Sequence, residues 1–266
     1  MHTEALPIPP AVTALISRTI DRLRHLQVQP DPIVPAQHRQ RYGILTSAVR
    51  ADGQILEMAI SEALKALPHL RLVRTPPIFI PPLVDQIVGG VASAETLRSS
   101  HLHYEGDQGR KVAPDLVLID ANRKAIDFLE VKRGLARTDA GKTRQTIRDL
   151  RCLQLVGKSY ALRQLNAEVD TATAAVCAIH GATAVPADLQ VAVEDLEVRY
   201  GLSLRAVISA TYTEFGRQLD ELLFQQALDE EIESLYPERL QEGAPVSPLI
   251  GFAEQEPGMG DTITPA

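Results

Sequence analysis

The sequence predicts an α/β fold in which a central mixed sheet has helices on both faces. From about residue 52 onward, segments with apolar residues at helical spacing alternate with short apolar runs that are typical of strands. Two of these runs, within 112–134, flank a polar turn and predict a β-hairpin. The chain has 266 residues, of which 45% are hydrophobic, so it is long enough for one substantial domain with extensions.

The expected elements follow from apolar spacing and from the positions of Pro, Gly and capping residues. Helices are expected at 11–27, 52–67, 82–88, 139–166, 186–201 and about 213–235, with Asp52 as the N-cap of the second helix. Strands are expected at 70–74, within 76–82, on both sides of the hairpin turn, and at 171–181 and 204–210.

This order divides the chain into four parts. Residues 1–48 form a helical extension with a Pro-rich linker, and residues 49–210 form the core. Residues 211–240 form an acidic C-terminal helix, and the Gly- and Pro-rich tail 241–266 is expected to be disordered.

The net charge of −7 is unevenly distributed. Between Arg133 and Arg163 the chain has eight Lys or Arg residues and two acids. From Glu214 to the end it has twelve acids and two Arg residues. A local basic face matters more for phosphate binding than the charge of the whole chain does. A solvated helix face explains the basic segment about equally well. Aromatic residues make up only 4% of the chain, which argues against a base-stacking platform.

Targeting features point to the cytoplasm. The N-terminus lacks the basic start and apolar run of a signal peptide, and no stretch approaches the roughly 20 apolar residues of a membrane helix. Cys152 and Cys177 lack metal-ligand spacing and are expected to be reduced thiols. We therefore expect no membrane partner. His101 and His103 lie in a polar loop without the partner cluster that a metal site needs.

The hairpin carries charges where a buried strand should be apolar. A turn centred on Asn122 and Arg123 places Asp115 opposite Glu130, with Lys132 two residues further along the same face. Two opposed carboxylates repel each other unless a cation lies between them or one is protonated. A hard divalent metal resolves this, so we expect Mg²⁺, with Mn²⁺ as a substitute. The other hairpin acids, Asp120 and Asp127, are expected at the turn end and on the solvent face.

Pro114-Asp115 followed by Glu130-Val131-Lys132 resembles the PD-(D/E)xK motif of the restriction-endonuclease-like nucleases. The resemblance covers about 130 residues and implies an αβββαβ core, with helical extensions at both ends. It implies Asp115, Glu130 and Lys132 as catalytic residues, and the Val131 carbonyl as a further metal ligand. The segment Gly53–Glu57 resembles the GxxxE start of the first core helix in archaeal junction resolvases, which implies Glu57 as a metal ligand ahead of Glu62.

The resemblance implies metal-dependent hydrolysis of phosphodiester bonds in DNA. It also implies a homodimer, since many such nucleases cut two strands as dimers. Phosphate contacts are expected from the basic segment, namely Arg137, Lys142, Arg144, Arg148 and Arg151. The alternative is a catalytically inactive protein of the same fold that binds DNA or serves in assembly. Two other interpretations remain. The substrate of the nuclease is RNA, or the charges belong to a surface hairpin with a cross-strand salt bridge and no nuclease site.

Overall fold

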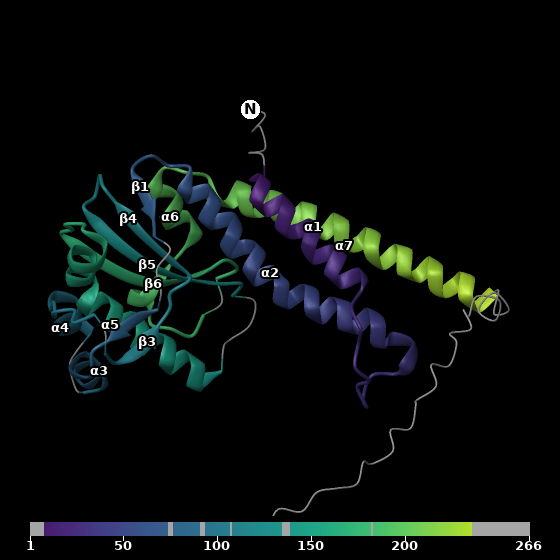
Figure 1. Ribbon diagram of the computed structural model, residues 1–266, viewed down its shortest axis with the longest axis horizontal. Coiled ribbons are helices and arrows are strands. Elements are labelled where there is room, and N and C mark those ends of the chain that lie inside the picture. Colours follow the sequence, from purple (N-terminus) through teal and green to yellow (C-terminus); the bar gives the residue numbers. More distant parts are fainter. Residues whose placement is uncertain are drawn as a thin grey trace, which may run out of the picture. The chain divides into compact units, whose positions relative to one another are not determined.

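A five-stranded mixed sheet lies at the centre of the fold (Figure 1). Its order is β1-β4-β5-β6-β7, where β1 is Leu70–Leu72, β4 Leu116–Asp120, β5 Ala125–Lys132, β6 Thr171–Ala178 and β7 Gln190–Val191. The first three strands of this order are antiparallel, and the last three are parallel. Parallel β5 and β6 require a crossover, which helix α5 (Ala140–Leu165) provides. The predicted α/β class with a mixed, helix-flanked sheet is confirmed.

The computed structural model describes residues 8–73, 77–90, 94–106, 108–134, 139–181 and 183–235. Of the predicted features, Arg137 and the tail 241–266 lie outside these ranges. The chain divides into two compact units, Met1–Leu223 and Phe224–Ala266, and the whole sheet belongs to the first. None of the described helices combines the length and the apolarity that a membrane span needs.

Each face of the sheet buries its own apolar core. One core joins the sheet to α1 (Pro10–Arg24), α2 (Arg39–Lys65), α6 (Val193–Tyr200) and the first part of α7 (Leu204–Leu235). The other joins it to α5, α3 (Pro82–Gly89), α4 (Ala94–Ser99) and a small sheet of β2 (Ile78–Ile80) and β3 (Arg110–Val112). Alternation along β4 supplies both cores, since Leu116 and Leu118 enter the first, and Val117 and Ile119 the second.

The predicted strand at 204–210 is wrong, because these residues begin helix α7. Leu204, Val207, Ile208, Thr211 and Phe215 are buried at helical spacing. A short apolar run cannot be assigned to strand or helix by periodicity alone, and here packing on the first core selects the helix.

The second predicted helix begins too late. Helix α2 starts at Arg39 and continues through the expected boundary at 48/49, so Asp52 lies inside the helix and is not its N-cap. Gly43 is a helix interior residue because α2 packs closely on the segment after α1: an added Cβ would lie 2.4 Å from Cγ2 of Val28. Tertiary packing thus outweighs the low helix propensity of Gly and Asp.

The segment 186–201 also differs from the single helix predicted. Pro186 precedes a 3₁₀ turn (Ala187–Leu189), strand β7 adds to the sheet, and α6 follows from Val193. Gly201 ends α6 in a left-handed conformation, φ 69°, as expected for a C-terminal glycine. The short elements α4 and β3 were not anticipated from the sequence.

Helix α5 has the predicted ends. The Asp139 side chain accepts hydrogen bonds from the N–H groups of Gly141 (2.8 Å) and Lys142 (3.2 Å), and Asn166 follows the helix at φ 47°. Gly157 lets this helix approach the sheet, since an added Cβ would lie 2.7 Å from Cβ of Ala172 and 2.8 Å from the Phe128 ring.

We expect Gly157→Ala to lower the free energy of unfolding by about 1–3 kcal/mol, because overpacking outweighs the gain in helix propensity. Gly216→Ala in α7 is the matched control, since nothing lies within 4 Å of an added Cβ there. This variant should stabilise the protein by up to about 1 kcal/mol. Urea unfolding measures both, and a Gly157→Ala protein as stable as wild type would refute the close approach.

Candidate active site

The hairpin that contains the predicted site has the register expected from the sequence. β4 and β5 pair from Leu116↔Leu129 to Asp120↔Ala125. Within the turn, Lys124 has a positive φ of 48°. The Asp120 carboxylate accepts the N–H of Arg123 at 3.0 Å within this turn.

Asp115 lies one residue before β4, next to the last pair of the ladder. Its Oδ2 accepts a hydrogen bond from the backbone N–H of Val131 at 2.7 Å, which fixes the carboxylate against β5. The N–H and C=O of a strand residue face the same neighbouring strand. The Val131 carbonyl therefore faces the side on which Asp115 lies, beyond the start of β4 at Leu116.

Glu130 and Lys132 lie at the end of β5 and form an ion pair, with 2.8 Å between Oε2 and Nζ. Phe128 packs in the core beneath α5, so the alternation of side chains places Glu130 and Lys132 on that face. Val117 of β4 packs in the same core, and the same alternation assigns Asp115 to this face too.

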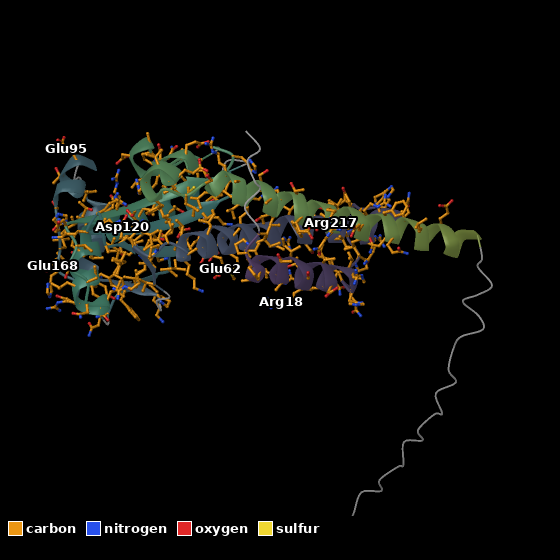
Figure 2. All side chains as sticks on the ribbon, turned by 90° about the horizontal axis from the view of Figure 1, so that it is seen from above. Arg18, Glu62, Glu95, Asp120, Glu168 and Arg217 are labelled. Atoms are coloured by element: carbon orange, nitrogen blue, oxygen red, sulfur yellow. The ribbon has the colours of Figure 1, made fainter. Side chains whose placement is uncertain are left out.

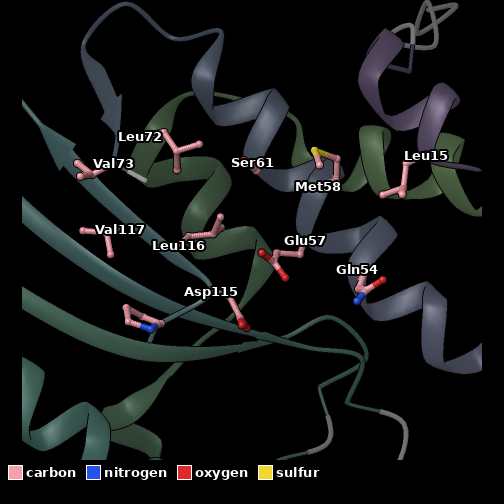
Figure 3. A pocket seen from close by; sticks show the side chains of 11 residues that line it. Leu15, Gln54, Glu57, Met58, Ser61, Leu72, Val73, Asp115, Leu116 and Val117 are labelled. Atoms are coloured by element: carbon pink, nitrogen blue, oxygen red, sulfur yellow. The ribbon is translucent and has the colours of Figure 1, made fainter. Parts of the chain in front are cut away.

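Helix α2 brings Glu57 to this end of the hairpin. Glu57 and Asp115 line one cavity of about 580 Å³, together with Gln54 and Ser61 of the same helix. Figure 3 shows the carboxylates of Glu57 and Asp115 pointing into the same space. Glu62, the other acidic candidate on α2, instead pairs with Lys65 at 3.4 Å. Glu57 is therefore the stronger candidate.

Glu57 and Glu130 have raised pKa values. Burial raises the pKa of Glu57, and the charges of Asp115 and Glu130 raise it further. Burial also raises the pKa of Glu130, Asp115 adds to the rise, and Lys132 opposes it. Burial on its own would lower the pKa of Lys132, but the hydrogen bond and charge of Glu130, with the charges of Asp115 and Glu57, raise it overall.

The donor chemistry of this set fits a hard divalent cation. Mg²⁺ prefers oxygen ligands, and three carboxylates and the Val131 carbonyl supply them. A cation would also offset the repulsion that raises the pKa of Glu57 and Glu130. Within the described ranges, no three His, Cys, Asp or Glu side chains are grouped closely enough to hold a metal ion as they stand. Binding by all three acids therefore requires a side-chain rearrangement.

The predicted DNA-binding residues on α5 have unequal environments. Lys142 and Arg144 are exposed. Arg148 is exposed too, but its Nε lies 3.0 Å from Oδ1 of Asp85. Arg151 is only 5% exposed and its guanidinium pairs with Asp188, which leaves it little surface for a phosphate contact. Arg144, Arg148 and Arg151 lie on one side of α5 and line one cavity, whereas the helical period places Lys142 on the opposite side from Arg151.

Asp120 lies at the turn end, as expected, and is 1% exposed. The expectation that Asp127 lies on the solvent face is wrong, because Asp127 is 0% exposed. Asp127 accepts hydrogen bonds from the Tyr200 hydroxyl (2.8 Å), from Nη1 of Arg123 (2.9 Å) and from the Thr173 hydroxyl. These bonds satisfy a buried carboxylate and connect the hairpin to β6 and α6.

The sequence reasoning missed a second charged group close to Lys132. Asp52, which is 4% exposed, pairs with Arg133 at 2.8 Å between Oδ2 and Nε. His180, just after β6, stacks on Tyr212 of α7, with 3.0 Å between Nε2 and the hydroxyl oxygen. One signal was present: Asp52 falls on the apolar stripe of α2, where a charge needs a partner.

We expect Glu57→Gln to reduce the loss of stability between pH 4 and pH 7 in the presence of a chelator. The folded pKa of Glu57 is raised above its ordinary value of 4.5, so the unfolded chain releases this proton first as the pH rises. The folded state therefore loses stability from about pH 4.5 up through the folded pKa. Urea titrations at both pH values measure the difference.

Glu62→Gln on the same helix is the matched control (Glu62 is labelled in Figure 2) and should follow the wild type, since Glu62 pairs with Lys65 at 3.4 Å. A Glu57→Gln protein with the full wild-type pH dependence would contradict the electrostatic coupling.

Comparisons of the chain with protein-family models, with curated proteins and with solved structures give no match. The functional interpretation therefore depends on the chemistry and placement of the chain's own residues.

Proposed function

We propose that this protein is a metal-dependent nuclease that hydrolyses phosphodiester bonds in DNA by a PD-(D/E)xK mechanism. The observation that carries the proposal is the convergence of three acids and Lys132 at one end of the hairpin, where the charges of Asp115 and Glu130 raise the pKa of Glu57. The element order α2, β1, β4, β5, α5, β6 supports it, because this is the order of the restriction-endonuclease-like core.

Asp115, Glu130, Glu57 and the Val131 carbonyl would hold Mg²⁺, or Mn²⁺ in its place. The metal supplies acidification of a bound water and neutralisation of charge on the phosphate. The chain holds the oxygen donors in position: the Val131 N–H orients Asp115, and helix α2 presents Glu57 from the other side of the cavity.

Lys132 has the character of a permanent cation. Its raised pKa keeps the ammonium charged at neutral pH, since the surrounding acids outweigh the effect of burial. A charged ammonium donates hydrogen bonds and accepts none. We therefore assign Lys132 to orienting the attacking water and to stabilising negative charge on the phosphate, and not to removing a proton.

The purified protein should cut at least one DNA form (linear, nicked, branched or single-stranded) when Mg²⁺ or Mn²⁺ is present, and EDTA should stop it. Asp115→Ala and Glu130→Ala should abolish cutting, and Lys132→Ala should lower the single-turnover rate by at least about 100-fold. DNA binding measured in Ca²⁺ should persist in all three, because the main phosphate contacts come from elsewhere. Glu62→Gln should cut like wild type.

Two outcomes would lead to other conclusions. Binding without cutting in either metal, together with no effect of Asp115→Ala, would favour the inactive DNA-binding or assembly module. Cutting confined to RNA forms in the same panel would change the substrate class and leave the site assignment intact.

The exposed residues of α5 give a separate prediction. If Lys142 and Arg144 contact phosphates, the double variant Lys142→Ala/Arg144→Ala should flatten the slope of log K against log salt by about 1.8 on duplex DNA, or about 0.9 for each contact. Fluorescence anisotropy in the presence of Ca²⁺ measures the slope. A salt range of about 50 to 200 mM is sufficient, because DNA affinity changes steeply across it. An unchanged slope would assign both residues to a solvated face.

A further inference from the structure

The ends of β5 and β6 bring two unassigned residues next to the proposed site. The two strands stay paired beyond their last ladder positions: the N–H of Ile179 bonds the Lys132 carbonyl, and the N–H of His180 bonds the Arg133 carbonyl, both at 2.9 Å. Arg133 and His180 therefore lie together at the carboxyl ends of parallel strands. In α/β sheets, ligands bind in the space beyond such ends.

Two residues flank the Arg133 guanidinium. Asp52 of α2 lies 2.8 Å from Nε, and Tyr212 of α7 is close enough for Arg133 to oppose the burial that raises the pKa of this phenol. Nε and Asp52 Oδ2 form a close ion pair in which the N–H is not aligned for a hydrogen bond. A guanidinium has five N–H donors, and the Arg133 side chain keeps 29% of its surface exposed. Donors thus remain for an external acceptor.

The pair is costly as a purely structural feature. Burial raises the pKa of Asp52 even though Arg133 and His180 oppose the rise, so the carboxylate is not fully compensated. Buried ion pairs are commonly replaceable by apolar residues without loss of stability. Arg151, by contrast, has only 6% of its side chain exposed beside Asp188, which leaves it little surface for a ligand. Partial exposure distinguishes Arg133 from Arg151.

We propose that Arg133 binds a backbone phosphate of the DNA strand next to the bond that is cut, and that Asp52 and Tyr212 hold its guanidinium in position for this contact. His180, stacked on Tyr212 at 5.6 Å between ring centroids, keeps the phenol in place. The assignment rests on the proposed nuclease function, to which it adds a positioning residue for the substrate strand. Arg fits this task because its planar donors match phosphate oxygens.

A binding experiment in Ca²⁺ tests the contact without requiring cleavage. With a short duplex DNA, Arg133→Ala should flatten the slope of log K against log salt by about 0.9. Arg18→Ala on α1 (Figure 2) removes an equal charge from an exposed position and should leave the slope unchanged. An unchanged slope in Arg133→Ala, or no DNA binding by the wild type, would overturn the proposal.

Arg133→Ala leaves Asp52 buried without its cation, so the variant has a risk of misfolding. The double variant Asp52→Asn/Arg133→Gln removes both charges and keeps hydrogen-bonding groups of similar size. It should retain wild-type circular dichroism and show the same flattened slope. A folded double variant with the wild-type slope would likewise overturn the proposal.

Replacing one charged phosphate of the DNA by an uncharged methylphosphonate gives a further test. A purely structural role of Arg133 would not change its result. On a DNA whose preferred cut is mapped, a single methylphosphonate next to that bond should slow wild-type cleavage and have no further effect in the double variant. Equal slowing in both proteins would refute the contact. If no DNA is cut but the Ca²⁺ slope still depends on Arg133, the hydrolytic function fails and the phosphate contact stands.

Discussion

The double pairing of β5 is the constraint on which the rest of the structure depends. This strand is antiparallel to β4 on one side and parallel to β6 on the other, so its register is fixed along both edges. Because its side chains alternate, Phe128 enters one core and Leu129 the other. A shift by one residue would exchange the two cores and would also turn Glu130 and Lys132 to the wrong face. Packing and the proposed chemistry thus depend on the same register.

The carboxylates on and around the hairpin have two different environments. Asp127 is fully buried and accepts hydrogen bonds from four side chains, which satisfy its buried carboxylate. At the open end, Asp115, Glu130 and Glu57 are near one another, and Lys132 compensates them only in part. Neighbouring acids that destabilise the ionised forms of Glu57 and Glu130 are typical of a functional site.

Helix α2 connects the two charged groups. Asp52 and Glu57 are five residues apart on one continuous helix, a rise of about 7.5 Å. Arg133, the partner of Asp52, directly follows β5, and Glu130, a neighbour of Glu57, lies near the end of this strand. The alternation of side chains places Arg133 and Glu130 on opposite faces. The helix therefore crosses the strand end and contributes one carboxylate to each group. Rigid elements on both sides limit how far the side chains can move apart, which suits a site that must hold a strand in place.

The sequence by itself determined those features whose signals are local. The period of two along 116–132 and the short turn set the hairpin register, and hence which charges meet, since one alignment alone keeps both strands buried. Asp139 and Asn166 marked the ends of α5 because caps are chosen by residues within one helical turn.

Tertiary structure decided what depends on partners distant in the chain. Residues 204–210 became helix because their apolar face meets a core formed by α1 and α2. Arg151 and Asp127 became buried because Asp188 and Tyr200 were there to satisfy them. Asp52 became a partner of Arg133 in the same way. A charge can be buried only where another element supplies its counter-charge or hydrogen bonds, and no local pattern specifies that element.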